Sequence, residues 1–190
     1  MVAQGCVIQG AHRSQRLDQG VFLQVFSASS SGLLRYGQLQ VRCALGKGGV
    51  IAAAAKREGD GASPIGVWPI RRIMWRADKM NAPQTSFGVT AIQPDDGWCD
   101  SADDASYNLP VTHPYPVSAE RMWRDDDLYD IVVILGHNDD PVVAGAGSAI
   151  FMHCARPDYE PTQGCVALSH KDLLALLAVA KQGDCVEITG

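Results

Sequence analysis

Two neighbouring stretches decide the fold of this chain. Residues 145–154 read Gly-Ala-Gly-Ser-Ala-Ile-Phe-Met-His-Cys, and residues 162–169 read Thr-Gln-Gly-Cys-Val-Ala-Leu-Ser. In the first stretch, the apolar run 150–152 predicts a strand that ends at His153. The loop that follows contains Pro157 and Pro161, and it should turn the chain back toward Cys165. A strand, a turn and a return would bring His153 and Cys165 together.

The pairing of Cys165 with His153 suits nucleophilic catalysis. A free thiol is mostly protonated at neutral pH, whereas a neighbouring imidazole can take its proton and stabilise the thiolate. Gly164 leaves room for a substrate carbonyl, and the N–H groups of Gly164 and Cys165 are candidates for an oxyanion hole. The hydroxyl of Thr162 is expected to orient the loop. The pattern predicts Cys165 as nucleophile and most reactive thiol, with His153 as its base.

The spacing of these residues does not by itself require catalysis. A core cysteine beside a histidine with satisfied hydrogen bonds is the more common cause of such a pattern. A metal site made of His153, Cys154, Cys165 and His170 is a poorer interpretation, because no two of them have the spacing of a usual ligand pair. Cys154 should point away from His153, since neighbouring side chains on a strand face opposite sides. We expect neither a metal nor a cofactor.

The sequence patterns outside these two stretches predict a mainly β fold. Apolar or alternating patterns indicate strands at 21–26, 39–45, 66–75, 128–136, 147–153 and 185–189, with a turn at 27–32. One helix is expected after Ser169, which can cap it, with Asp172 three positions on and Gly183 beyond its end. A shorter helix is expected from Ser118 through Trp123.

The stretch 80–116 is rich in proline, aspartate and asparagine, which predicts a long irregular insertion over the surface. We therefore expect residues 1–190 to form a single domain. It should be a β-sandwich with one or two packed helices and this insertion.

Composition limits the partners. The chain has 190 residues, 46% of them hydrophobic, and a formal net charge of −5 at pH 7, which argues against nucleic acid as the main partner. No apolar run is long enough to span a bilayer, and no signal peptide is visible at the N-terminus. The six cysteines are scattered at positions 6, 43, 99, 154, 165 and 185. They suggest small buried side chains and one reactive thiol rather than a disulfide scaffold.

His153 and the run Thr162-Gln163-Gly164-Cys165 together resemble the catalytic signature of the L,D-transpeptidase (YkuD-like) family, in which a histidine at a strand end is followed by Ser/Thr-x-Gly-Cys. Upstream, Ser63-Pro64-Ile65-Gly66 is similar to the Thr-Pro-x-Gly turn that family members carry before a strand. Further blocks resemble one branch of the family, and they lie at 56–61, 95–100, 107–108 and 147–151. The resemblance runs from about residue 40 to the end.

The resemblance implies a β-sandwich enzyme that acts on peptidoglycan stem peptides. The Cys165 thiolate would attack the carbonyl of the third residue, a thioester would form and the terminal D-alanine would leave. An amine on a neighbouring stem would then make a cross-link. The resemblance places the protein in the periplasm or cell envelope. A hydrolase with the same Cys–His pair, such as a carboxypeptidase or amidase, and a non-catalytic cell-wall-binding module remain alternatives.

Several residues are candidates for substrate binding. Many family members carry arginine or asparagine two positions after the cysteine, where this chain has Ala167. A substrate carboxylate would then need another cation, and Arg124, Arg57 and Lys56 are the candidates. Arg124 could equally neutralise the aspartates that follow it. His137 is either a second polar wall of the pocket or part of a polar turn, and Ser148 lies in one of the blocks shared with the family.

Overall fold

The computed structural model describes residues 15–16 and 22–190, and in that part β-strands dominate. Most of the predicted strands are confirmed, although their ends differ by a few residues. The strand at the first predicted position continues through the serines for which a turn is predicted, and the turn begins only after Ser29. The strands are β1 (Gln15–Arg16), β2 (Phe22–Leu23), β3 (Val25–Ser29), β4 (Leu33–Tyr36), β5 (Leu39–Ala44), β6 (Val50–Ala52), β7 (Ser63–Trp75), β8 (Val89–Ala91), β9 (Asp96–Cys99), β10 (Pro110–Thr112), β11 (Ala119–Arg121), β12 (Ile131–Leu135), β13 (Phe151–Cys154), β14 (Val166–Leu168) and β15 (Cys185–Thr189).

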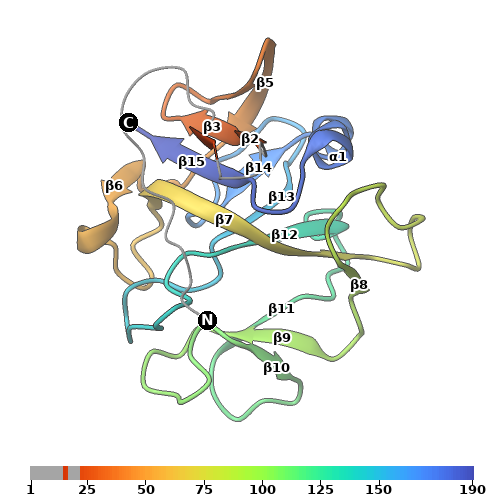
Figure 1. The fold of residues 1–190 in the computed structure, drawn as a ribbon. Helices are drawn as coiled ribbons and strands as arrows, with labels where there is room; N and C mark the ends of the chain where they lie inside the picture. The colour runs from red at the N-terminus through yellow and green to blue at the C-terminus, as the bar shows by residue number, and fades with distance from the viewer. Residues whose placement is uncertain (1–14, 17–21) are drawn as a thin grey trace.

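The largest sheet closes on itself through the long strand β7. Its order is β12-β13-β14-β5-β4-β3-β15-β7-β6, and β7 pairs with β12 as well. The first half of β7 pairs with β15, and the second half pairs with β12 from Trp75↔Ile131 onward. Strand β7 therefore joins the part of the sheet that contains β15 to the part that contains β12, and it crosses the molecule between them (Figure 1). These two parts of the sheet enclose the main core.

The main core follows from the alternation of side chains along these strands. Met152 and Cys154 of β13, Val166 and Leu168 of β14 and Ile73 of β7 all lie in it. The residues that alternate with them along each strand point to the opposite face of the sheet, where they are available to form a functional site. Burial of this contiguous apolar cluster is the dominant stabilising term of such a fold.

The predicted helix is confirmed as α1 (His170–Val179). The Ser169 hydroxyl accepts a hydrogen bond from the Asp172 backbone N–H, which satisfies one of the free donors of the first turn. Leu173, Leu176 and Leu177 are buried against the core, and α1 packs against β13 and β14. The helix therefore backs the two strands that carry the site. A single 3₁₀ turn, η1 (Ala53–Ala55), completes the helical structure of the described residues.

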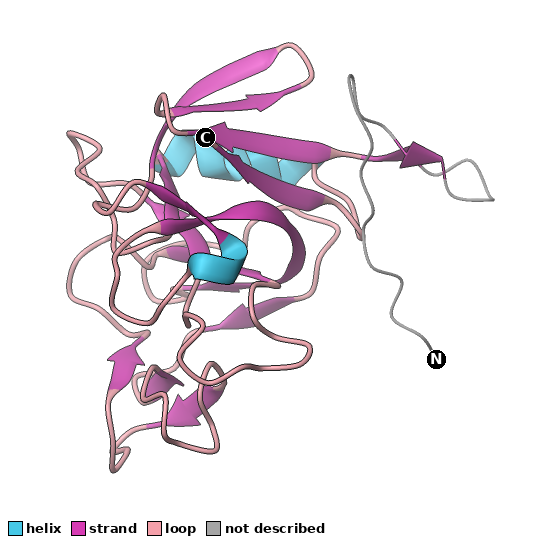
Figure 2. Cartoon of the chain, turned by 90° about the vertical axis from the view of Figure 1, so that its left-hand side faces the viewer, coloured by secondary structure: helices cyan, strands magenta, loops and turns pink. Residues whose placement is uncertain are grey.

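Two predictions about the middle of the chain are wrong. The expected helix from Ser118 is instead the strand β11, because Ala119–Arg121 pairs antiparallel with β9. The insertion 80–116 is not irregular throughout, since it contains β8, β9 and β10. Strands β10, β9 and β11 form a small separate sheet, which lies beyond β12 and away from β15 (Figures 1 and 2).

A second apolar cluster joins this small sheet to the large one. Trp98 of β9 packs edge-on against Phe151 of β13, with ring centroids 5.0 Å apart. Tyr129, Met122 and Cys165 belong to the same cluster. The nucleophile candidate therefore lies at the junction of the two sheets.

Three further predictions concern the motif at residues 63–66, the N-terminus and membrane-spanning segments. Ser63-Pro64-Ile65-Gly66 does not form a turn, because these residues begin the strand β7. The N-terminal expectations, including the lack of a signal peptide and the role of Cys6, lie outside the described residues. In the described part, no helix is both long and apolar enough to cross a bilayer.

Candidate active site

Strand β13 presents His153 to the side opposite the main core. Cys154 lies in that core, so the alternation predicted for this pair is confirmed. His153 pairs in register with Val132 on one side and with Ala167 on the other, and its side chain is only 6% exposed. The ring Nδ1 lies 2.9 Å from the Cys154 carbonyl oxygen. A carbonyl can only accept, so Nδ1 carries the proton and Nε2 keeps its lone pair.

Cys165 lies directly before β14, and its sulfur is held by two backbone groups. The thiol donates to the Ala149 carbonyl at 3.1 Å, and the Phe151 N–H donates to the sulfur at 3.4 Å. Among the described residues, the thiol makes no hydrogen bond to the His153 ring. The sulfur is thus fixed against the chain segment that leads into β13.

The loop before Cys165 is tied down by Thr162 and Ser63. The Thr162 hydroxyl donates to the Cys165 carbonyl at 2.7 Å and accepts from the Gly164 N–H at 3.1 Å, so it orients the loop as expected. The buried Ser63 hydroxyl donates to the Gly164 carbonyl at 2.8 Å and accepts from the Gly46 N–H at 2.9 Å. The bond from Ser63 to Gly164 fixes the loop before Cys165 relative to β7.

Gly164 is required for a different reason from the one predicted. Its φ of +132° is in a region that favours glycine, and a Cβ there would lie 3.0 Å from the Ala62 carbonyl oxygen. The glycine therefore permits close packing against the body of the protein rather than open space for a substrate. Its N–H is already bonded to Thr162, so it can contribute to an oxyanion hole only if that bond opens.

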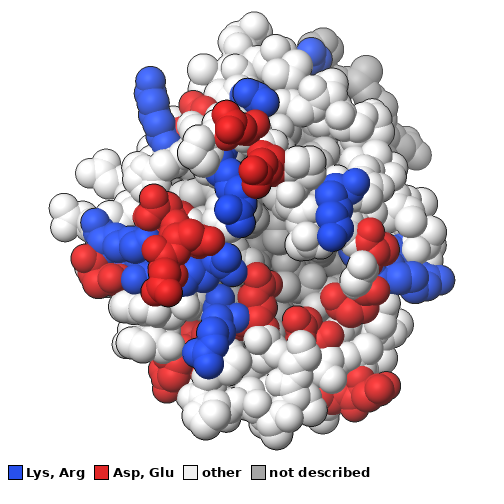
Figure 3. Space-filling model, turned by 180° about the vertical axis from the view of Figure 1, so that it is seen from behind, with Lys and Arg blue, Asp and Glu red and all other residues white. Residues whose placement is uncertain are grey.

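His153 and Cys165 line the same cleft, which has a volume of about 540 Å³. His153 comes from β13 and Cys165 from the position directly before β14, which pairs with β13. Acidic and basic groups both line the cleft, and the face seen in Figure 3 carries both signs of charge around a hollow. The lining comprises Glu58, Asp100, Glu120, Arg121, Arg124, Leu128, Tyr129, Ser148, Ala149, His153, Arg156, Glu160, Pro161, Thr162, Gln163, Cys165 and Ala167.

Burial keeps both members of the pair neutral at rest. Loss of hydration lowers the pKa of His153 to about 4, with the nearby Arg124 acting in the same direction. Burial raises the pKa of the Cys165 thiol to about 12, and the negative charge of Glu120 adds to this effect. Both shifts favour a neutral thiol and a neutral imidazole over the thiolate–imidazolium pair expected from the sequence.

The predicted substrate-binding residues do not all reach the cleft. Arg124 lines it, and its guanidinium also binds both oxygens of Asp126 at 2.8 Å. Ser148 lines it too, and its hydroxyl donates to Glu58 at 2.7 Å. Lys56 and Arg57 are absent from the lining. The Lys56 ammonium is buried against Asp60 and the Arg57 carbonyl, and Arg57 binds backbone carbonyls of residues 54 and 56.

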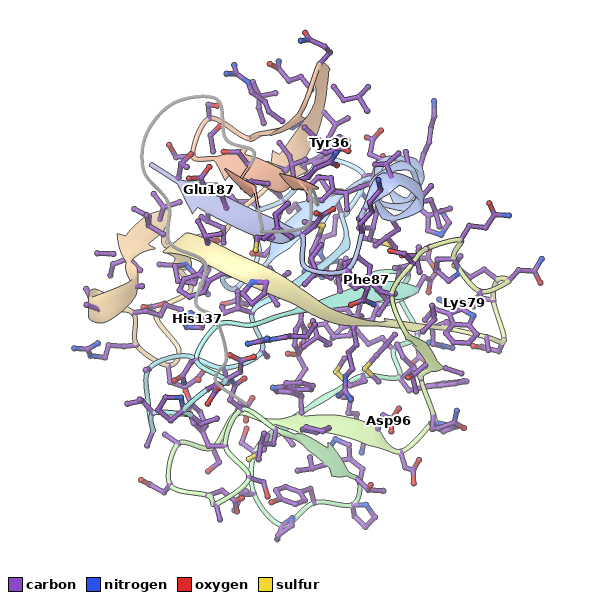
Figure 4. All side chains as sticks on the ribbon, in the orientation of Figure 1. Tyr36, Lys79, Phe87, Asp96, His137 and Glu187 are labelled. Carbon is purple, nitrogen blue, oxygen red and sulfur yellow. The ribbon has the colours of Figure 1, made fainter. Side chains whose placement is uncertain are left out.

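His137 also lies away from the nucleophile. His137 is labelled in Figure 4. Its Nε2 lies 3.1 Å from the Ala146 carbonyl oxygen, and its ring packs edge-on against Trp68 of β7, with ring centroids 4.7 Å apart. Burial lowers the pKa of His137. It belongs to the polar turn that follows β12, which is the second of the two roles considered for it.

Sequence reasoning missed the residues that surround His153. The Tyr129 ring packs against the His153 ring at 5.3 Å, and its hydroxyl donates to Glu120 at 2.5 Å. Burial raises the pKa values of both Tyr129 and Glu120. Arg121 and Arg156 also line the cleft. These residues lie on separate strands and loops, so no sequence spacing connects them.

The metal alternative has no support in the geometry. Cys154 faces the core while His153 faces the cleft, so the proposed ligands do not converge. In the described ranges, no group of three His, Cys, Asp or Glu side chains is arranged to hold a metal ion.

Among the solved structures that the chain is similar to are two of low sequence identity. L,D-transpeptidase 1 of Mycobacterium tuberculosis is 14% identical with a TM-score of 0.40, and the match covers 88% of this chain and 62% of that one. An L,D-transpeptidase from Mycobacterium smegmatis is 11% identical with a TM-score of 0.40, covering 90% and 64%. This chain thus spans less than two thirds of either structure. The comparison with curated proteins gave no match.

The comparison with protein families is more direct. Residues 25–188 match the family described as the L,D-transpeptidase catalytic domain, YkuD. The matched range includes every strand of the large sheet except the last residue of β15, and every residue that lines the cleft. The chain therefore belongs to the L,D-transpeptidase catalytic domain family.

Proposed function

We propose that this chain catalyses L,D-transpeptidation on peptidoglycan stem peptides at the cell envelope, with Cys165 as nucleophile and His153 as base. One observation carries the proposal: the two side chains, from different segments, line one cleft in a chain that belongs to this family. The fixed tautomer of His153 supports the assignment, because its Nε2 is able to accept a proton.

Acylation begins from the neutral pair. As the sulfur attacks the carbonyl carbon of the third stem residue, the thiol proton passes to Nε2 of His153, and a C–S bond forms. The imidazolium then gives that proton to the amine of the terminal D-alanine as the C–N bond breaks. Because the charged pair is disfavoured in the buried site, proton transfer and attack are coupled. The product is a thioester on Cys165.

Deacylation repeats these steps in reverse with an acceptor. An amine on a neighbouring stem loses a proton to His153 as it attacks the thioester, and the thiol leaves with that proton restored. A new amide joins the two stems. Water in place of the amine would release the shortened stem, which is carboxypeptidase activity.

We propose Arg124 as the cation that meets a substrate carboxylate, in place of the side chain missing at Ala167. Both residues line the cleft, and a guanidinium suits paired bonds to a carboxylate. Lys56 and Arg57 do not share this role, because neither lines the cleft. Ser148 is proposed to act in the same cleft together with Glu58, to which its hydroxyl donates.

The test is incubation of the protein with purified muropeptides, followed by identification of products by mass spectrometry. We expect cross-linked dimers and free D-alanine, both lost in Cys165→Ala. The buried Cys43 lies outside the cleft, so Cys43→Ala is a matched control and should retain activity. Shortened monomers without dimers would identify a hydrolase, and binding without any product would identify a passive wall-binding module. Either result would overturn the proposal.

A further inference from the structure

Ala149 adopts an unusual backbone conformation beside the nucleophile. Its φ is +51°, in the left-handed region that alanine rarely occupies. In this conformation its carbonyl accepts the Cys165 thiol at 3.1 Å. Backbone strain of this kind persists only where the surroundings hold it in place. Some group must therefore fix the Ala149 peptide.

The side chain of Asn108 is that group. It is only 5% exposed, and its Oδ1 accepts the Ala149 N–H at 3.0 Å and the Trp98 indole N–H at 3.0 Å. Its amide nitrogen donates to the carbonyl of His137 at 3.1 Å and to that of Asn138 at 2.8 Å. Both lone pairs of the oxygen and both amide hydrogens are used.

Asn108 therefore connects three segments that are distant in the sequence. It lies between β9 and β10, it binds the turn after β12, and it holds the segment that enters β13. Its own φ is +57°, a conformation that asparagine tolerates better than most residues. Asn108 is absent from the cleft lining, and its bond to the Ala149 N–H is its most direct link to Cys165.

We propose that Asn108 is a positioning residue for the nucleophile, which holds the Ala149 carbonyl where it fixes the Cys165 thiol in the resting state. The proposal rests on the proposed function, because it assumes that Cys165 is the nucleophile. It also assigns a role to the insertion 80–116, which supplies Asn108 to the site.

Two effects should follow when the hydrogen bond between the Asn108 side chain and the Ala149 N–H is lost. The sulfur is no longer held in one place, so acylation slows. The thiol also loses an acceptor that stabilises its protonated form, so its titration moves to lower pH. General loosening of the fold also hydrates the thiol and lowers its pKa, so a control variant that loosens the same region and keeps the Ala149 bond is needed to separate the two causes.

The test variant is Asn108→Gly, since glycine keeps the positive φ at 108 and removes only the side chain. We expect acylation by a tetrapeptide muropeptide to fall roughly 10-fold. The pH midpoint of iodoacetamide labelling at Cys165, followed by peptide mapping, should move down by about one unit. The labelling does not involve peptidoglycan. A shifted midpoint with no acylation even in the wild type would therefore disprove the proposed function and leave the positioning role intact.

The second variant tests the conformation at Ala149 directly. Ala149→Gly in the Asn108→Gly background should recover at least about threefold in acylation, because glycine enters the left-handed region without the Asn108 bond. Trp98→Phe is the matched control. It removes the other bond to the same Asn108 oxygen, so the melting temperature should fall while the labelling midpoint stays unchanged.

If Asn108→Gly does not fold, Ala149→Val replaces it, since a β-branched residue excludes the left-handed conformation. The labelling midpoint should then shift down as above. The proposal is overturned if the labelling midpoint is the same as in wild type in the variant that folds. It is also overturned if Trp98→Phe shifts the midpoint equally, or if Ala149→Gly gives no recovery.

Discussion

At the scale of single residues, His153 and Cys165 are both buried, and burial shifts the pKa of each toward the neutral form. With the pKa of the thiol raised to about 12, the thiolate fraction at pH 7 is on the order of 10⁻⁵. A resting thiol of this kind is protected from adventitious alkylation and oxidation. Cys165 should thus react slowly with small electrophiles at neutral pH and rapidly with a substrate that occupies the cleft. The reactivity of Cys165 should therefore depend on its position in the cleft rather than on a permanently ionised thiol.

Burial of neutral His153 predicts a pH dependence of stability. Its pKa is about 4 when folded, against about 6.5 for a free histidine, so between these values the unfolded chain binds more protons. Stability from this group is therefore fully present above about pH 6.5 and falls as pH drops toward 4. The slope should reach about 1.4 kcal/mol per pH unit. Urea unfolding at several pH values measures it.

Substitution assigns this slope to His153. His153→Gln should reduce the fall in stability between pH 6.5 and 4, because glutamine does not titrate in this range. An unchanged slope in His153→Gln would show that the histidine is not held neutral.

At the scale of elements, the nucleophile loop is fixed by bonds to strands that are far from it in the sequence. Ser63 at the start of β7 bonds the Gly164 carbonyl, and a parallel bridge joins Gly46 to Thr162. The loop between β13 and β14 therefore has little freedom, although it contains no regular structure. The sequence motif around Ser63 resembles a family turn, but in the structure it is an anchor.

Removal of the Ser63 hydroxyl should loosen this loop. Ser63→Ala leaves the Gly164 carbonyl and the Gly46 N–H buried without this partner, which should cost about 1–3 kcal/mol in the free energy of unfolding. Acylation should also slow, because the loop sets the position of Cys165. Urea unfolding and single-turnover kinetics measure the two effects. Ser63→Thr keeps a hydroxyl and should lie closer to the wild type; equal losses in both variants would exclude the hydrogen bonds as the cause.

The strands and helix that local patterns determine were predictable from the sequence. The alternation in β13 correctly separates His153 from Cys154, and the Ser169 cap correctly starts α1. The segment 118–123 was predicted wrongly because its conformation comes from pairing with β9, a long-range contact that local propensity does not contain.

The walls of the cleft were mostly missed for the same reason. Glu120, Tyr129 and Arg156 meet only after three separate segments have packed, so no motif joins them in the sequence. Arg124 and Ser148, which were candidates from the sequence, also line the cleft, whereas Lys56 does not. The buried ion pair of Lys56 with Asp60 cannot be told from a free cation by residue type alone.

At the scale of the whole molecule, the cleft forms where the small sheet meets the large one. The net charge is −5, yet the cleft contains three arginines, Arg121, Arg124 and Arg156, opposite several carboxylates. Stem peptides carry both ammonium and carboxylate groups, and a cleft with both signs of charge can orient them. The specificity of the protein should therefore depend on single charges in the cleft rather than on its net charge.

Arg124 should be the most informative of these charges. We expect Arg124→Ala to lower kcat/KM for a stem peptide with a side-chain carboxylate by about 10-fold, the effect of one charge-assisted hydrogen bond. Steady-state kinetics with that peptide and its amidated form measure the effect, and the amidated form should be affected less. Arg57→Ala removes a cation outside the cleft lining and is the matched control. Equal losses in the two variants, or for both peptides, would remove Arg124 from substrate recognition.

The central claim is that Cys165 carries the acyl group. The most direct measurement is brief incubation with a tetrapeptide muropeptide, acid quench, proteolysis and mass spectrometry of the peptide that contains Cys165. The account predicts a mass increase equal to the tripeptidyl acyl group on Cys165, removable by hydroxylamine as expected of a thioester, absent in Cys165→Ala and greatly reduced in His153→Gln. Turnover of the muropeptide by Cys165→Ala at the wild-type rate, or an acyl group found on another residue, would contradict it.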